Sequence, residues 1–162
     1  MNVLRTLAAA LAVLALTGCQ AHGEADSNLK AAQGFLRLNA QQPGVVTLPS
    51  GLEYKVLSSG PATGPHPGPA DEVKVNYEGK LLDGKVFDSS FQRGEPLDLA
   101  VDRVIPGWTE ALELMRPGDE WMLYIPPRLG YREKGAGPIP PNSLLIFRVQ
   151  LISILPRQPE MG

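Results

Sequence analysis

The stretch VKVNYEGKLLDGKVFD, residues 73–88, contains the pattern that decides the fold. Val73, Val75 and Tyr77 alternate with polar residues, which is typical of a strand with one buried and one solvated face. Asp83-Gly84 follows, and this dipeptide favours the tight turn of a β-hairpin. The stretch therefore predicts two antiparallel strands joined by a hairpin turn.

The rest of the chain adds short strands and one central helix. Residues 106–115 place Trp108, Leu112 and Met115 on one helical face, and Pro106 suits the first turn. With the strand at residues 73–77, we expect five or six strands in all. The others lie at residues 52–57, 86–88, 97–101, 121–125 and 145–151. The pattern predicts an α+β fold: a bent antiparallel β-sheet (half-barrel) wrapped around one short α-helix, with a short N-terminal helix.

Composition excludes several classes of protein. The 162 residues carry 15 basic and 17 acidic side chains, a formal charge of −2, whereas a nucleic-acid-binding protein would show a basic stripe. The 17 glycines and 16 prolines indicate many turns. One cysteine permits neither an intramolecular disulfide nor a four-cysteine zinc site.

The first residues are typical of an export signal rather than of a folded segment. An apolar run at residues 7–16 follows Arg5 and ends in Leu16-Thr17-Gly18-Cys19, which is similar to the bacterial lipobox, where the cysteine is lipidated. The alternative is an ordinary secretory signal that ends near a cysteine. We expect residues 1–18 to be a lipoprotein signal peptide, Cys19 the lipidation site, and residues 19–27 a tether. Residues 28–44 would form the N-terminal helix, 45–156 the main domain and 157–162 a tail.

Three weaker motifs are better explained as structure. Residues 79–85 match the start of a phosphate-binding loop, but Val86 stands where a Ser or Thr should hold magnesium, and no helix follows. His22 and His66 lie in the tether and in a loop rich in Pro and Gly, without partners at metal-ligand spacing. No serine or cysteine nucleophile has a plausible histidine base.

The aromatic residues lie at strand ends beside loops, and each taken alone could be an ordinary core residue. Their segments together resemble the FKBP-type peptidyl-prolyl cis-trans isomerases, in order and spacing, over residues 35–155. The five motifs are VKVNYEG (73–79), DGKVFDSS (83–90), VIPGW (104–108), IPPRLGY (125–131) and IPPNSLLIF (139–147). The lead-in SGLEY at residues 50–54 is similar to the exported Mip-like branch.

The resemblance implies a bent sheet around one helix and an isomerase domain at residues 45–156. It implies that Trp108 is the floor for the substrate proline and that Asp88 is the one charged group near the amide. The Ile105 N–H and the Tyr131 hydroxyl would donate hydrogen bonds to substrate carbonyls. Arg93 would hold Asp88 and Tyr77, with Ile139 at the rim. The walls would be Tyr77, Phe87, Leu97, Val104, Ile105 and Phe147.

Three departures from the family pattern affect this pocket. Arg132 follows Tyr131 where glycine is usual, and Pro138 stands where aliphatic or glycine residues are common, in a segment one residue shorter than usual. Leu97 replaces a common aromatic residue. We expect these changes to alter substrate preference and the affinity for macrolide inhibitors, and to leave the core unchanged.

The function implied by the resemblance is acceleration of X-Pro isomerisation during the folding of exported proteins, with proline-containing polypeptides as partners. No cofactor is required, because no bond is broken. The alternatives are a non-catalytic chaperone that uses the same groove and, less favoured, a structural or adhesion lipoprotein of the outer membrane. We expect a lipid anchor in the bacterial envelope, with the periplasmic side of the outer membrane favoured. Mip-like relatives dimerise through long N-terminal helices, and the short helix expected here predicts a monomer.

Overall fold

The structure is a computed structural model that describes the backbone of residues 14–155 and the side chains of residues 22–155. The predictions for residues 1–13 of the signal peptide, and for the 157–162 tail, fall outside this range. No helix in the described range is long and apolar enough to cross a membrane. Within the same range, no three His, Cys, Asp or Glu side chains are grouped so that they could hold a metal ion.

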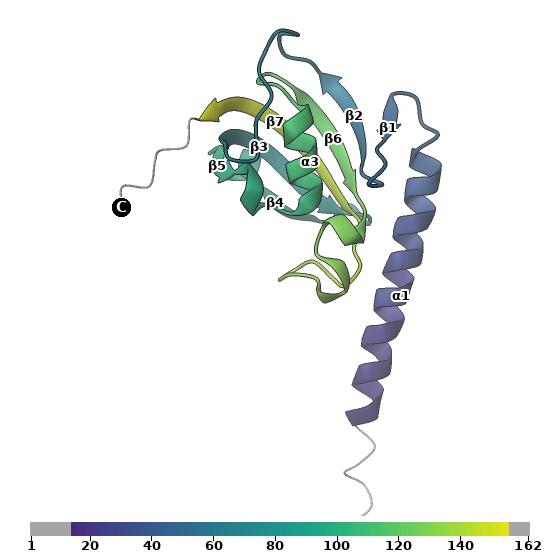
Figure 1. The fold of residues 1–162 in the computed structure, drawn as a ribbon. Helices are drawn as coiled ribbons and strands as arrows, with labels where there is room; N and C mark the ends of the chain where they lie inside the picture. The colour runs from purple at the N-terminus through teal and green to yellow at the C-terminus, as the bar shows by residue number, and fades with distance from the viewer. Residues whose placement is uncertain (1–13, 156–162) are drawn as a thin grey trace, which may run out of the picture.

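One antiparallel sheet of seven strands forms the domain (Figure 1), in the order β1-β2-β6-β7-β3-β4, with β5 also paired to β3. The prediction of five or six strands missed β1, which has only three residues. The predicted hairpin is confirmed, because Lys80 of β3 pairs with Val86 of β4 across the turn at Asp83-Gly84. The strands are β1 Val45–Thr47, β2 Glu53–Ser58, β3 Glu72–Leu81, β4 Val86–Ser89, β5 Leu97–Ala100, β6 Glu120–Ile125 and β7 Leu145–Leu155.

Helix α3, Pro106–Leu114, packs against one face of this sheet. Trp108 and Leu112 are buried on the predicted helix face, together with Met115 at its end. The helix approaches β6 closely: a Cβ on Gly107 would lie 2.7 Å from Cγ2 of Ile125. The predicted α+β architecture, an antiparallel sheet around a short helix, is confirmed.

The alternation of side chains gives the central strands two different faces. On β6, Leu123 joins the core around α3, whereas Met122 and Tyr124 belong to a second apolar cluster on the opposite face. On β7, Phe147 and Ile146 divide in the same way. Helix α1 packs on the part of this second face formed by Met122, Tyr124 and Ile146.

Helix α1, Leu14–Asn39, corrects the prediction for the N-terminal region. Residues 19–27, predicted as a tether, are helical, and the helix ends at Asn39 rather than at residue 44. Asn28, expected near a helix start, instead donates from Nδ2 to the Pro141 carbonyl at 2.9 Å. The polar, small residues of the segment suggested a tether, but the helix that docks on the sheet from Ala32 onward continues through it, because extending an existing helix avoids the cost of starting a new one. Because α1 has 26 residues, the expectation of a short helix was wrong, and the monomer stays a prediction without that support.

Contacts with the domain hold α1 from Ala25 to Asn39, while its N-terminal turns extend past the domain (Figure 1). Ala32 is buried against Leu144 and Ile146, with Phe35 and Leu36 packed around them. Asn142 donates from Nδ2 to the Ala25 carbonyl at 3.2 Å. At the other end, Asn39 Nδ2 donates to Glu53 Oε2 at 2.7 Å, and both residues are buried.

Short helical segments complete the fold. The four-residue helix α2, Ser90–Arg93, follows β4 directly. Three 3₁₀ turns occur: η1 Val101–Arg103 before α3, and η2 Pro127–Leu129 and η3 Arg132–Lys134 between β6 and β7.

Candidate active site

A cavity of about 730 Å³ opens beside the first turn of α3, on the core face of the sheet. Trp108, the third residue of α3, is only 4% exposed and lines it. The indole meets Phe147 and Tyr77 edge to face, with ring centroids 5.1 and 5.3 Å apart. The cavity lining is Tyr77, Phe87, Asp88, Leu97, Leu99, Arg103, Val104, Ile105, Trp108, Tyr131, Ala136, Gly137, Pro138, Ile139 and Phe147.

Two phenylalanines of the wall meet over a glycine. Gly79 on β3 pairs with Phe147 on β7 and with Asp88 on β4, so Phe87 and Phe147 reach it from neighbouring strands. Their rings lie 5.5 Å apart at 88°. A Cβ on Gly79 would be 2.5 Å from Phe147 Cε1 and 2.6 Å from Phe87 Cζ. Only a residue without a side chain leaves room for both rings in these positions.

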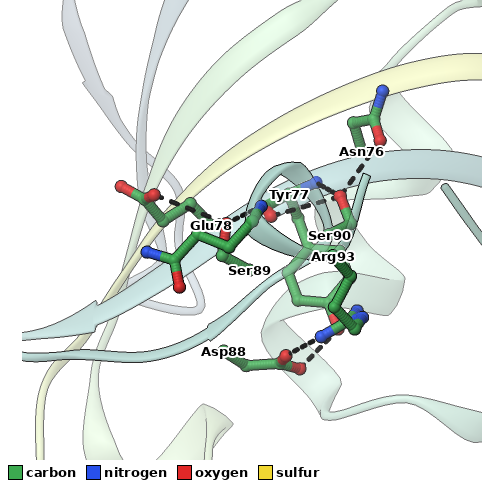
Figure 2. Close-up of polar contacts among 8 residues, drawn as sticks. Asn76, Tyr77, Glu78, Asp88, Ser89, Ser90 and Arg93 are labelled. Atoms are coloured by element: carbon green, nitrogen blue, oxygen red, sulfur yellow. Dashed lines mark hydrogen bonds and ion pairs between the residues drawn. The ribbon is translucent and has the colours of Figure 1, made fainter. Parts of the chain in front are cut away.

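Asp88 also lines the cavity, beside the aromatic rings. It accepts hydrogen bonds from Tyr77 and Arg93 (Figure 2). Arg93 also donates from Nη2 to the Tyr77 hydroxyl oxygen at 3.0 Å, and its guanidinium lies 5.7 Å from the centre of the Tyr77 ring. The three side chains therefore fix one another. The carboxylate that lines the cavity is neutralised by Arg93, which lies behind it and does not line the cavity.

The same contacts shift the pKa values of the group. Burial by itself would raise the pKa of Asp88, but hydrogen bonds from Tyr77 and Arg93, and the charge of Arg93, outweigh it and lower that pKa. Burial and the neighbouring Asp88 carboxylate raise the pKa of Tyr77, against the opposing effect of Arg93. At neutral pH the site holds an ionised Asp88 and a protonated Tyr77.

Helix α2 positions Arg93, and two serines attach it to the sheet (Figure 2). Ser89 caps the helix by accepting a hydrogen bond from the Gln92 N–H at 3.2 Å. Ser90 is fully buried; its Oγ accepts from the Tyr77 N–H at 2.8 Å and donates to Asn76 Oδ1 at 3.0 Å. Sequence reasoning missed this helix, although Ser89 and Gln92 have the spacing of a capping box.

The segment between β6 and β7 covers the other side of the cavity. Tyr131 is 37% exposed, whereas Ile139 is buried and forms an isolated bridge with Ala136. Arg132, at the position where glycine is usual in the family, has φ of +55°, so it retains the left-handed backbone that favours glycine. Its carbonyl accepts a hydrogen bond from the Asn142 N–H at 2.7 Å.

The structure brings the predicted site residues together. Asp88, Tyr131 and Trp108 line the cavity, as do all predicted wall and rim residues, while Arg93 contacts the site through Asp88 and Tyr77. Sequence reasoning missed Leu99, Arg103, Ala136, Gly137 and Pro138 as lining residues. Leu99 could have been found, because it lies two residues from Leu97 on the same strand.

Two family models match the chain. Residues 64–152 match the FKBP-type peptidyl-prolyl cis-trans isomerase model, and residues 6–56 match the model of the domain amino terminal to FKBP-type peptidyl-prolyl isomerase. The first match contains β3 to α3, β6 and most of β7, and thus the whole lining of the cavity.

Curated relatives agree with these models. The chain is 52% identical over 128 residues to the peptidyl-prolyl cis-trans isomerase Mip of Coxiella burnetii, covering 78% of this chain and 55% of the relative. It is 44% identical over 143 residues to the outer membrane protein MIP of Legionella longbeachae, covering 88% of this chain and 60% of the relative. The chain thus spans little more than half the length of these curated relatives.

Solved structures share the fold. FkpA from Escherichia coli superposes with a TM-score of 0.84 at 41% identity, covering 89% of this chain and 67% of that one. A peptidyl-prolyl cis-trans isomerase from Pseudomonas syringae gives 0.73 at 39% identity, covering 80% and 94%. With the family model matching the cavity-bearing domain, the chain belongs to the family of FKBP-type peptidyl-prolyl cis-trans isomerases.

Proposed function

We propose that the protein is a peptidyl-prolyl cis-trans isomerase that acts on proline-containing polypeptides in the bacterial cell envelope. The observation that carries this proposal is the cavity itself: aromatic rings surround a tryptophan floor, and one carboxylate neutralised by Arg93 lies beside them. Family membership supports the same activity.

Rotation about an X-Pro bond is slow because resonance gives the amide partial double-bond character, with a barrier of about 18–20 kcal/mol. At the transition state the amide is twisted, and its carbonyl has lost much of its dipole. An apolar cavity disfavours the planar, polar ground state more than the twisted state. About 5.4 kcal/mol of such differential stabilisation gives roughly 10⁴-fold acceleration.

Each residue has a specific task in this proposal. The substrate proline rests on Trp108, while the Ile105 N–H and the Tyr131 hydroxyl hold substrate carbonyls. Asp88, held by Arg93, faces the reacting amide. Catalytic stabilisation then comes either from a hydrogen bond to the proline nitrogen or from the carboxylate facing the carbonyl carbon. No covalent intermediate is needed.

The direct test measures isomerisation of a proline peptide by the full-length protein in mild detergent, with and without a macrolide of the FKBP class. We expect turnover that the macrolide inhibits. Asp88→Asn should reduce kcat/KM. The matched control is Asp98→Asn, because Asp98 is also a carboxylate in an ion pair, with Lys74 at 3.0 Å, and does not line the cavity. Equal, full activity of both folded variants would refute the role of Asp88.

A second pair of measurements distinguishes the isomerase function from the non-catalytic chaperone function. An isomerase accelerates the refolding of a client limited by proline isomerisation, whereas a holdase only suppresses its aggregation. Aggregation suppression without any acceleration of refolding would favour the non-catalytic alternative.

Two observations support a location in the cell envelope. Cys19 ends a sequence similar to a lipobox and would be the lipidated first residue of the mature protein. The Legionella longbeachae relative is named an outer membrane protein. We expect the wild-type protein in the outer-membrane fraction and Cys19→Ser in the soluble envelope fraction. Incorporation of labelled palmitate should be lost in the same variant. Equal fractionation of both proteins would refute the anchor.

A further inference from the structure

Arg103 is a charged residue of the cavity lining that the proposed mechanism does not use. Among the described residues that line the cavity, only Asp88 and Arg103 carry a formal charge. Asp88 is ion-paired with Arg93. Arg103 is exposed and forms no ion pair within the described part of the chain. The cavity therefore has one cation at its mouth that no carboxylate of residues 22–155 neutralises.

The backbone beneath Arg103 is fixed, so its guanidinium extends from a defined position. Arg103 ends η1, whose first residue, Val101, is fully buried. The Val101 carbonyl accepts a hydrogen bond from Thr109 Oγ1 of α3 at 2.7 Å, and its N–H donates to the Asp71 carbonyl at 3.0 Å. Val104 and Ile105, which directly follow, line the cavity.

The charges around the mouth favour an anionic ligand group. Asp88 contributes one negative charge, and Arg93 and Arg103 contribute two positive charges, so the local balance is positive although the whole chain is at −2. Of the nearby carboxylates, Asp98 pairs with Lys74, and Asp102 does not line the cavity.

We propose that Arg103 selects polypeptides in which a glutamate or aspartate flanks the proline. The guanidinium presents a planar fork of N–H donors that fits a carboxylate. This inference rests on the proposed isomerase function and names the substrate class of the same cavity. Because Arg103 is exposed, the preference is modest and falls with added salt.

The experiment compares proline peptides with Glu, Gln, Lys or Leu immediately before the proline, and a second set with the same residues immediately after it. The full-length protein in a neutral detergent is assayed at low and high salt. The variants are Arg103→Gln, Arg103→Lys and Arg103→Glu. Arg37→Gln is the matched control, because it removes the same charge from an exposed position in the last turn of α1.

In one of the two sets, we expect the wild type to prefer Glu over Gln by about two- to fivefold in kcat/KM at low salt. That ratio should fall to about one in Arg103→Gln, persist in Arg37→Gln, and reverse in Arg103→Glu in favour of Lys. In Arg103→Lys, which keeps the charge and loses the planar fork, it should be reduced but stay above one. A wild type that turns over all peptides without a Glu preference, or a preference that Arg103→Gln retains, overturns the inference alone. A wild type that turns over no peptide refutes the isomerase function instead.

Discussion

Two neighbouring residues of β7 lie on opposite faces of the sheet, one of which carries the cavity while the other packs against α1. Phe147 is 5% exposed and lines the aromatic cavity, while Ile146, 8% exposed, packs beneath α1 with Ala32. The two residues are almost equally buried, so burial does not tell a binding wall from a structural contact. What distinguishes the cavity face is that its rings leave space open beside Trp108, whereas the small side chain of Ala32 lets α1 approach the other face closely.

The largest contrast between the faces should come from aromatic truncation. Trp108→Leu removes the cavity floor, and we expect kcat/KM per folded molecule to fall at least about tenfold, which corresponds to about 1.4 kcal/mol of transition-state stabilisation. Phe35→Leu weakens the ring contact with Tyr124 on the α1 face, with centroids 5.8 Å apart. It should lower the free energy of unfolding by about 1 kcal/mol and leave kcat/KM within about twofold. Proline-peptide assays and urea unfolding of both variants measure the two effects.

An added methyl group should have opposite effects on the two sides. Gly79→Ala forces Phe87 and Phe147 apart, and we expect it to lower the free energy of unfolding by about 1–3 kcal/mol. Gly34→Ala, in α1, meets no atom within 4 Å and should raise stability by about 0.5–1 kcal/mol because alanine favours helix. Chemical denaturation of the two variants gives both values. A stabilised Gly79→Ala protein would mean that the rings can move without penalty.

A pH titration tests the polar edge of the cavity face. The lowered pKa of Asp88 means that the stability this carboxylate contributes is present above its ordinary value of about 4 and is lost as pH falls through the lowered pKa. Arg93→Gln removes the ion pair and leaves the burial that raises the pKa of Asp88. The pKa of Asp88, and with it the pH at which this stability is lost, should therefore rise. Carbon-13 NMR of the Asp88 carboxyl measures it, and Lys74→Gln, which unpairs Asp98 instead, should leave Asp88 unchanged.

The smallest expected effect is at the end of α1. Burial raises the pKa of Glu53, although hydrogen bonds from Asn39 and Thr47 oppose the shift. The folded protein therefore loses stability as pH rises from about 4.3 through the raised pKa. Glu53→Gln keeps an acceptor for Asn39 and removes the charge, so its unfolding free energy should fall less between pH 4 and 7 than that of the wild type. Urea unfolding at both pH values decides this, with the exposed Glu24→Gln as the control that should behave as the wild type does.

Much of the cavity face could be predicted because its signals are local. Strict alternation in β3, the Asp83-Gly84 turn and the helical spacing in α3 each fix which side chains point toward the core. The order of short motifs then identified residues that distant strands bring together. Leu97 and Leu99 mark the limit of this approach. The family motifs placed Leu97 in the cavity wall, but they did not identify Leu99, which lies on the same face of the strand and also lines the cavity.

The α1 face could not be predicted in the same way. The polar residues 19–27 have no strong helical periodicity, and the helix is stabilised by contacts distant in the sequence, such as Asn142 with Ala25. Asp26, Ser27 and Asn28 are residue types that favour the N-cap position of a helix, yet they lie inside α1. The lining contributed by Ala136 to Pro138 depends on the path of an irregular loop, for which short sequence patterns give no direct signal.

The continuity of α1 also fixes a standoff. From residue 19 to Ala25, where its first hydrogen bond to the domain occurs, a helix rises about 9 Å. A continuous helix keeps the domain at a nearly constant distance from residue 19, whereas a flexible segment of equal length would let that distance vary. Under the anchoring at Cys19 proposed above, this helix would keep the domain within a short distance of the membrane surface, where it would encounter polypeptides close to the bilayer.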